Sequence, residues 1–236
     1  MLSEALSYPT ESEEWTRPFL VGSGLLLASF FIGLTIIPLY GYYMRVLDAG
    51  RTGSRRLPAF DDWEGLIVDG VKMFVVNFVY AGIPALVFLG GMTAVFVGLG
   101  LGVASESGGV VLVALLFGGA VALVSGLVWL AGMLLVPAAL ARMRDHDELG
   151  AAFHVRTLFG VVADRDYLVA VGLAWTVGFA ISTVGSLLSL LLVGLPVLFF
   201  GGLVTFHLFG QGYARAVGPS GRRSREVPSS TGPRVN

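Results

Sequence analysis

The chain has 236 residues, of which 31 are charged and none is cysteine. Three stretches, 18–44, 73–141 and 167–214, together contain 144 residues and only one of these charges, Glu106. A soluble domain needs charge over its whole surface, so this distribution excludes a soluble globular protein. The lack of cysteine excludes disulfides, thiolate metal sites and cysteine nucleophiles.

The apolar stretches predict an all-α integral membrane protein with about five transmembrane helices. A helix rises ~1.5 Å per residue, so about 20 apolar residues cross a bilayer core of ~30 Å. Glu106 lies in the turn sequence Ala-Ser-Glu-Ser-Gly-Gly, and Gly194 with Pro196 predicts a second hairpin. A break around 182–189 is the alternative, but it would leave two short halves. The five spans are expected at 19–44, 73–104, 109–141, 167–192 and 196–217 within one domain, 19–217.

Two segments between the spans are amphipathic, and we expect each to form a helix at the membrane interface, over 60–72 and 147–163. In the first, Asp61 and Glu64 are spaced as a capping pair at a helix start. Trp63 begins the apolar face that follows and is expected at headgroup depth.

Matching details in the two halves favour a parallel internal repeat of span, interfacial helix and span. Pro38 precedes Arg45 by the same spacing that separates Pro137 from Arg144. A short Ala-Phe sequence follows in each half, at Ala59 and Ala152. Chance matching is the alternative, because the matches are few.

The charged loops predict the topology. Arginines and lysine are abundant after spans one and three and after span five, and absent from the Glu106 and Gly194 turns. The positive-inside rule therefore predicts a multi-pass cell-membrane protein with its acidic N-terminal segment, 1–18, outside and its C-terminus in the cytoplasm. The basic tail, 218–236, is expected to be disordered and to attract anionic lipid headgroups.

Small residues at four-residue spacing mark packing seams in the spans, because helices in lipid gain contact energy from close backbone approach. Examples are Gly98 with Gly102, Gly118 with Ala122, and Gly178 with Ser182. We expect these seams to join helices of one chain. Contact between copies, and so a homo-oligomer, is the alternative.

Three polar side chains inside the spans form a candidate polar pocket: Asn77, His207 and Gln211. His207 and Gln211 are one turn apart, and Asn77 lies at a similar depth in another span. As a functional site the three would bind a lipid headgroup or a small solute. As a structural feature they would be an interhelical hydrogen-bond clamp, which is the favoured interpretation.

A candidate interfacial site comprises Asp61, Asp62, Trp63 and Asp69. Carboxylates could bind a cation or serve a lipid-acting enzyme, with His146 as a further candidate. Capping and polar-face roles explain them more simply. The sequence contains no catalytic constellation, phosphate loop or dinucleotide fingerprint, and we predict no catalytic, cofactor-binding or metal-binding residue and no nucleic-acid partner.

The segment from Leu57 to Lys72, LPAFDDWEGLIVDGVK, resembles an archaeal membrane family, domain of unknown function 4013, that is common in haloarchaea. The N-terminal Ala5-Leu-Ser-Tyr-Pro9 and Glu14-Trp15 share the likeness, which extends to about Gly218. The resemblance implies a multi-pass membrane protein and no known substrate or cofactor.

Three functions follow as hypotheses. The leading one is a non-catalytic membrane scaffold, lipid-associated module or subunit with a protein partner still to be identified. The second is a passive transporter or channel for a small solute or lipid, lined by Asn77, His207 and Gln211. The third is an enzyme that acts on lipid at the inner interface.

Overall fold

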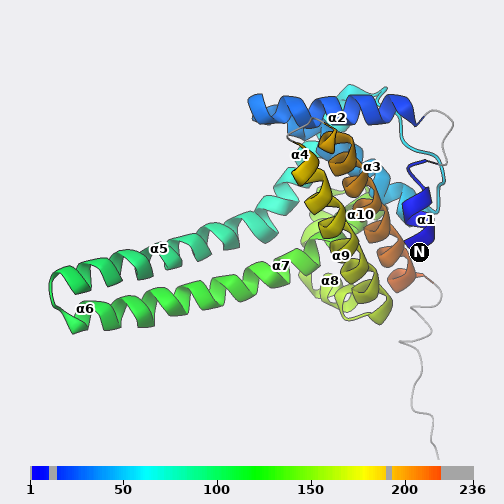
Figure 1. The fold of residues 1–236 in the computed structure, drawn as a ribbon. Helices are drawn as coiled ribbons and strands as arrows, with labels where there is room; N and C mark the ends of the chain where they lie inside the picture. Colours follow the sequence, from blue (N-terminus) through cyan, green and yellow to red (C-terminus); the bar gives the residue numbers. More distant parts are fainter. Residues whose placement is uncertain (1, 11–14, 190–192, 219–236) are drawn as a thin grey trace, which may run out of the picture.

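The computed structural model describes residues 2–10, 15–189 and 193–218, and it is all-α over these residues. The helices form a compact body from which one long hairpin extends (Figure 1). The body contains α1 (Leu2–Ser7), α2 (Thr16–Phe31), α3 (Ile36–Thr52), α8 (Val155–Val162), α9 (Arg165–Leu188) and α10 (Gly194–Val217). The hairpin and its base contain α4 (Trp63–Asn77), α5 (Ile83–Ala104), α6 (Gly108–Val113) and α7 (Gly119–His146).

The hairpin is made of two unusually long helical runs. A π-helical turn, η2 (Phe78–Gly82), joins α4 to α5, and a second one, η3 (Ala114–Gly118), joins α6 to α7. The runs contain 42 and 39 residues. The first interfacial helix predicted from the sequence is thus continuous with the following span. The turn predicted at Glu106 is confirmed, since α5 ends at Ala104 and α6 begins at Gly108.

Glycines allow the two arms of the hairpin to pack closely against each other, as predicted from the small residues at four-residue spacing. A Cβ atom at Gly91 would lie 2.8 Å from the Ala122 nitrogen, and one at Gly118 would lie 3.1 Å from the Gly91 oxygen. A Cβ atom at Gly98 would meet Ala114. The arms therefore touch backbone to backbone, and these seams lie within one chain.

The body is built around α3 and α10, with α9 against α10. Gly41 of α3 touches the backbone of Leu66 in α4, and Gly50 touches the backbone of His207 in α10. The predicted seam of α9 also lies within the chain, because Gly178 faces Thr205 of α10. The start of α10 at Gly194 agrees with the predicted second hairpin.

The structure differs from the sequence prediction at the segment 19–44. There α2 ends at Phe31, a 3₁₀ turn, η1 (Gly33–Thr35), follows, and α3 begins at Ile36. Pro38 explains the break, because proline donates no backbone hydrogen bond and its ring conflicts with the carbonyl four residues earlier, that of Leu34. Among the described residues, four helical runs are long and apolar enough to cross a membrane, and α2 is a shorter apolar helix that lies across the start of α10 (Figure 1).

Two further details differ. The second predicted interfacial helix, 147–163, consists of a short 3₁₀ helix, η4 (Leu149–Phe153), followed by α8. Asp147, whose φ is +53°, ends α7 in a left-handed conformation and does not begin the next helix. The predicted tail, 218–236, lies outside the described residues beyond Gly218, as do the last residues of the span expected at 167–192.

Candidate functional site

The start of α4 carries three of the four predicted interfacial residues. Asp62 is its N-cap and accepts a hydrogen bond of 3.0 Å from the Gly65 nitrogen. The cap is thus Asp62, one residue later than the predicted Asp61, which is largely exposed. Trp63 is 45% exposed and stacks obliquely on Phe60, with ring centroids 5.9 Å apart. The capping hydrogen bond from Gly65 and the Arg45 guanidinium lower the pKa of Asp62.

Arg45 of α3 connects the predicted interfacial residues to one another. Its Nη2 atom donates to Asp62 Oδ2 at 2.7 Å, and its Nε atom lies 3.9 Å from Asp69 Oδ2. Asp61 Oδ1 lies 3.8 Å from Nη1 of the same guanidinium. All three aspartates therefore face one cation, and α3 is tied to both the start and the second turn of α4.

A second arginine brings the end of α7 into this cluster. Arg144 Nη1 lies 3.1 Å from both carboxylate oxygens of Asp69, and its Nη2 lies 3.9 Å from Asp48 of α3. Arg51 then bridges Asp48, at 2.9 Å, and Asp145, at 2.6 Å. We call these residues the basal ion network: Arg45, Asp48, Arg51, Asp61, Asp62, Asp69, Arg144 and Asp145.

The basal ion network lies where the hairpin joins the body, and it links α3, α4 and α7. Sequence reasoning placed Asp61, Asp62 and Asp69 there but did not pair them with Arg45 or Arg144. One signal was available, because Asp69 lies between apolar residues, Leu66 to Val68 and Gly70 to Val71, and a buried carboxylate in such a segment requires a partner. Its side chain is only 13% exposed, which is consistent with a paired carboxylate.

The three predicted pocket residues do not meet. Asn77 donates to the Met73 carbonyl of its own helix at 3.0 Å and lines a cavity of about 160 Å³ with Pro137, Trp175 and Phe206. Phe206 of α10 points toward the Asn77 cavity. The next residue, His207, points about 100° away around the helix, and Gln211 lies on the same face as His207. They therefore belong to a different cavity.

The second cavity contains His207, Gln211 and residues that the sequence did not associate with them. Gln211 Nε2 lies 3.3 Å from His207 Nε2 and 3.3 Å from the Glu4 carboxylate of α1. The Tyr8 ring stacks on His207, with centroids 4.1 Å apart, and its hydroxyl donates to the Arg56 carbonyl. These contacts hold the N-terminal segment against α10 and the loop that follows α3.

This second cavity has a volume of about 200 Å³ and is the most polar of those described in the structure. It lies between α1, α10 and the loop 53–55. Its floor is formed by the buried side chains of Tyr8 and His207. Two exposed lining residues, Glu4 and Arg55, carry charges of opposite sign.

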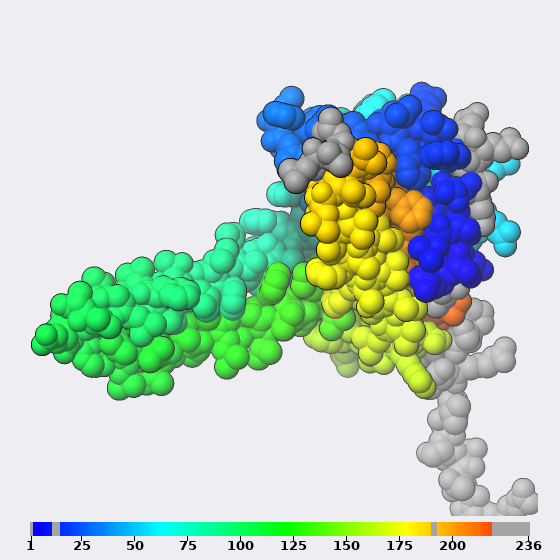
Figure 2. All heavy atoms as spheres, viewed as in Figure 1, coloured from blue at the N-terminus to red at the C-terminus, as the bar shows by residue number. Residues whose placement is uncertain are grey.

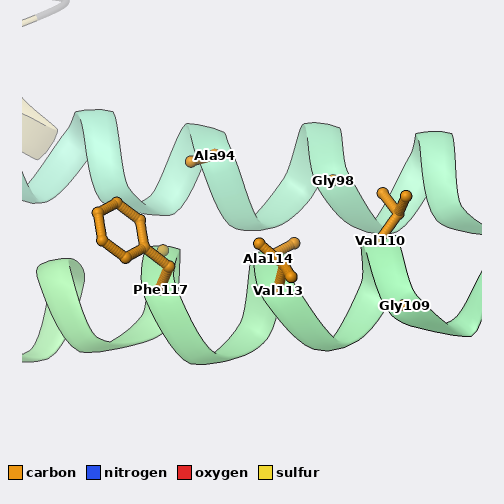
Figure 3. Close-up of a pocket in the computed structure, with 8 residues that line it drawn as sticks. Ala94, Gly98, Gly109, Val110, Val113, Ala114 and Phe117 are labelled. Carbon is orange, nitrogen blue, oxygen red and sulfur yellow. The ribbon is translucent and has the colours of Figure 1, made fainter.

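The hairpin itself bears two apolar grooves. One, of about 420 Å³, lies between α5 and the run of α6 with η3, where Gly98 faces Ala114 and Phe117 borders the opening (Figure 3). The other, of about 530 Å³, lies nearer the body, between Pro84 on α5 and Val124 on α7. These surfaces can accept apolar chains or helices and offer little to a polar ligand.

The predicted interfacial carboxylates are engaged by backbone and guanidinium groups. Asp62 caps a helix, and Asp61, Asp62 and Asp69 all face Arg45. His146, proposed as a catalytic candidate, lies 3.2 Å from the Arg142 carbonyl of its own helix and 3.9 Å from Asp145. Neither of these two contacts of His146 involves Asp61 or Asp62.

Comparison with known proteins gives a family and no closer relative. No curated protein and no solved structure matches the chain. One family model matches residues 24–190, which cover α3 to α9 and so include the hairpin and the basal ion network. The matched segment is more than half of the chain, and it contains the Phe-Asp-Asp-Trp sequence on which the resemblance rests. The chain therefore belongs to the family described as "Protein of unknown function (DUF4013)".

Proposed function

We propose that the protein is a non-catalytic, lipid-associated membrane scaffold. In this proposal the hairpin of α5 and α7 is inserted in the bilayer, and the basal ion network fixes it to a body that carries the polar surfaces. The observation that carries the proposal is the hairpin, whose outward side chains are apolar along its length. Figure 2 shows this arm projecting from the body with no other helix over its visible face.

The exposure of large apolar side chains supports bilayer insertion. Phe117 is 73% exposed, and Leu123, Leu101 and Val113 are also largely exposed. Such a continuous apolar surface is unstable in water, and the hydrocarbon core of a bilayer covers it at no cost in unsatisfied polar groups. The 22 residues of α5 would extend ~33 Å, close to the thickness of that core.

The exposed face of α4 supports association with lipid at the base of the hairpin. Trp63, Ile67, Val71 and Phe74 are exposed at helical spacing, whereas Leu66, at the edge of this stripe, is fully buried. An apolar stripe that is not covered by the protein, beginning with tryptophan and continuous with a span, is typical of a helix that enters a membrane at the headgroup level.

The basal ion network supports a scaffold rather than a catalyst. A catalytic carboxylate needs access to substrate and a free proton-accepting oxygen. Here the aspartates are held by guanidinium groups of neighbouring helices. Such pairing contributes rigidity and orientation, which are the properties that a scaffold requires.

Four membrane crossings fit this proposal better than five. With α2 too short to cross as an upright helix, an even number of crossings places both ends of the domain on one side. The contacts of Glu4 with Gln211 and of Tyr8 with His207, near the C-terminal end of α10, agree with that arrangement. By the positive-inside rule we assign the arginine-rich side to the cytoplasm, and the N-terminal segment with it.

A depth measurement tests the scaffold proposal. The chain contains no cysteine, so single cysteines can be placed without background. Phe117→Cys and Leu123→Cys on the hairpin, and Ser54→Cys in the exposed loop, would each carry an environment-sensitive fluorophore in nanodiscs. We expect quenching by lipids brominated along the acyl chain at positions 117 and 123, and quenching by iodide at position 54.

The same three variants also show which results would contradict the proposal. If positions 117 and 123 react with a charged, water-soluble maleimide as fast as position 54, the hairpin is outside the bilayer and the proposal fails. If these positions are protected from both water and lipid, a protein covers the arm, and the lipid-associated part of the proposal is wrong.

A further inference from the structure

The cavity that contains Asn77 lies at the base of the hairpin, where residues of α4, α7, α9 and α10 meet. Among the described residues that line it, none is ionisable, and Asn77 carries the only side-chain oxygen. A charged ligand would lose its hydration there without gaining an ion pair. The cavity therefore suits a neutral molecule.

The Asn77 side chain offers this cavity a hydrogen-bond acceptor. Its Nδ2 atom donates to the Met73 carbonyl at 3.0 Å, which fixes the orientation of the amide, because a carbonyl accepts only from the nitrogen end. Its Oδ1 atom accepts no hydrogen bond within the part of the chain that the structure describes, and the atom keeps accessible surface. An acceptor among apolar residues favours a ligand that brings a donor.

A second acceptor, on the backbone, lies beside the cavity. Pro137 is inside α7 and has no N–H group, so it cannot donate to the Met133 carbonyl four residues earlier. Both Met133 and Pro137 line the cavity. Two helices thus bring acceptors to this region, and a ligand whose polar group only accepts, such as a ketone or an ether, is disfavoured. A hydroxyl group can donate.

The size of the cavity and its aromatic wall indicate the rest of the ligand. Its volume of about 160 Å³ is close to that of an apolar cavity of roughly 150 Å³ that holds benzene. Phe206 and Phe209 meet edge to face in its wall, with ring centroids 5.6 Å apart, and Trp175 lines it from α9. Such walls favour another ring, which stacks or packs edge-on. A water molecule needs about two to four polar partners, more than this wall provides.

We propose that this cavity binds the ring of a neutral phenol, whose hydroxyl donates to Asn77 Oδ1 and whose ring packs against Trp175, Phe206 and Phe209. The phenol is either a free molecule or the ring of a phenol with a hydrocarbon tail dissolved in the bilayer. Met133 and Trp175 are partly exposed, so the wall of the cavity extends to the outer surface of the helices. The site does not depend on the scaffold role, which the depth measurement tests at other positions.

The test uses the full chain in nanodiscs and fluorine NMR of para-fluorophenol, with empty nanodiscs as the measure of partition into lipid. The matched probe is para-fluoroanisole, which has the same ring and an oxygen but no donor. We expect saturable binding of para-fluorophenol and at least tenfold weaker binding of para-fluoroanisole. Equal binding of the two probes, or no binding of para-fluorophenol beyond that of empty nanodiscs, would overturn the proposal.

Substitutions show whether the phenol occupies this cavity. Asn77→Leu removes the acceptor at similar size and should weaken binding of para-fluorophenol at least tenfold. Thr176 is the matched control, because it also donates to a carbonyl four residues earlier and follows Trp175 but does not line the cavity. Thr176→Val should change binding less than twofold. Ala81→Leu fills the cavity, keeps Asn77 and should abolish binding, so either variant tests the site if the other fails to fold. Binding that survives both substitutions contradicts the proposal.

Competition distinguishes the two sources of the phenol. If the natural ligand has a hydrocarbon tail, para-decylphenol should displace para-fluorophenol from the protein. If the natural ligand is a free phenol, para-cresol should displace it and para-decylphenol should not. Decylbenzene has the ring and the tail without the hydroxyl, and displacement by decylbenzene as effective as by para-decylphenol would refute the role of Asn77 Oδ1.

Discussion

Arg144 and Asp69 are 75 residues apart in the sequence, yet the Arg144 Nη1 atom lies 3.1 Å from both carboxylate oxygens of Asp69. The pair joins the last turns of α7 to the first turns of α4, at the point where both arms of the hairpin leave the body. Because each side chain is less than one quarter exposed, solvent screens the pair only in part. The pair therefore adds a polar contact at the base of the hairpin to the apolar packing of Leu140 and Met143 in the core.

Removal of one member of this pair should loosen the hairpin. Asp69→Asn leaves Arg144 with the distant Asp48 and should destabilise the protein by about 1–2 kcal/mol, less than a fully buried pair would lose. Thermal unfolding in detergent measures the stability. The distance between spin labels at positions 117 and 54, measured by pulsed electron resonance, should broaden in the variant.

Exposed Asp61 is the matched control for Asp69. Asp61→Asn removes an aspartate whose nearest approach to Arg45 is 3.8 Å at a largely exposed position, and it should leave both stability and the label distance unchanged. Equal effects of the two substitutions would show that the Arg144 contact has no special role in positioning the hairpin.

Asp62 should make the start of α4 sensitive to acid. Its folded-state pKa is lowered, chiefly by the hydrogen bond from the Gly65 nitrogen and then by Arg45. A lowered folded-state pKa means that ionised Asp62 contributes stability above its unfolded-state pKa, and that this contribution is lost as the pH falls through the folded-state pKa. Amide hydrogen exchange in α4 should therefore accelerate at low pH.

Two substitutions separate the contribution of the Asp62 charge from that of its capping hydrogen bond. Asp62→Asn keeps a capping oxygen and loses the charge, so exchange in α4 should become less dependent on pH. Asp62→Ala loses both, and it should accelerate exchange already at neutral pH and lower the melting temperature by a few degrees. Unchanged exchange in the alanine variant would rule out Asp62 as the functional cap.

Substitution by alanine should change the stability of the protein differently at two neighbouring glycines of α5. Gly91→Ala places Cβ 2.8 Å from the Ala122 nitrogen and should cost about 1–3 kcal/mol by separating the arms. Gly90→Ala points into open space and should be neutral or slightly stabilising, because alanine favours the helix. Unfolding of both variants in detergent provides the comparison, and equal stabilities would contradict the described seam.

The position of the N-terminus offers a direct test of the four-crossing topology. A reporter that is active only in the cytoplasm, fused before Met1 in one strain and after Asn236 in another, should be active in both. The five-span topology predicted from the loops alone gives activity only in the C-terminal fusion. Activity in that fusion alone would thus restore α2 and α3 as a single crossing.

The small-residue seams and the turn at Glu106 could be predicted because they depend on neighbours in sequence. A run of apolar residues sets the length of a helix, and Glu106 with its flanking serines and glycines ends one. The break before α3 carried a local signal too, in Pro38, but the sequence prediction placed one continuous span through it, at 19–44. Whether proline bends or ends a helix depends on what lies around it, here Gly70 of α4, which packs against the Ile37 carbonyl.

The candidate sites were predicted only in part, for a related reason. Asp61, Asp62, Trp63 and Asp69 do gather at the start of α4, because they belong to one helix and its cap. His207 and Gln211 share a face of α10, one turn apart. Asn77 was grouped with them by depth alone, and depth does not determine direction around a helix. The structure places Asn77 with Trp175 and Phe206 in another cavity.

By itself, the sequence determined that this is a helical membrane protein, where most of its long helices lie and where they turn. Hydropathy and helix rise are properties of a single segment, and they need no partner. The tertiary structure decided which arginine meets which aspartate, that the N-terminal segment closes a polar cavity against His207 and Gln211, and that one hairpin stands apart from the body. These features come from contacts between residues far apart in the chain, and many alternative pairings of the same charges satisfy the sequence equally well.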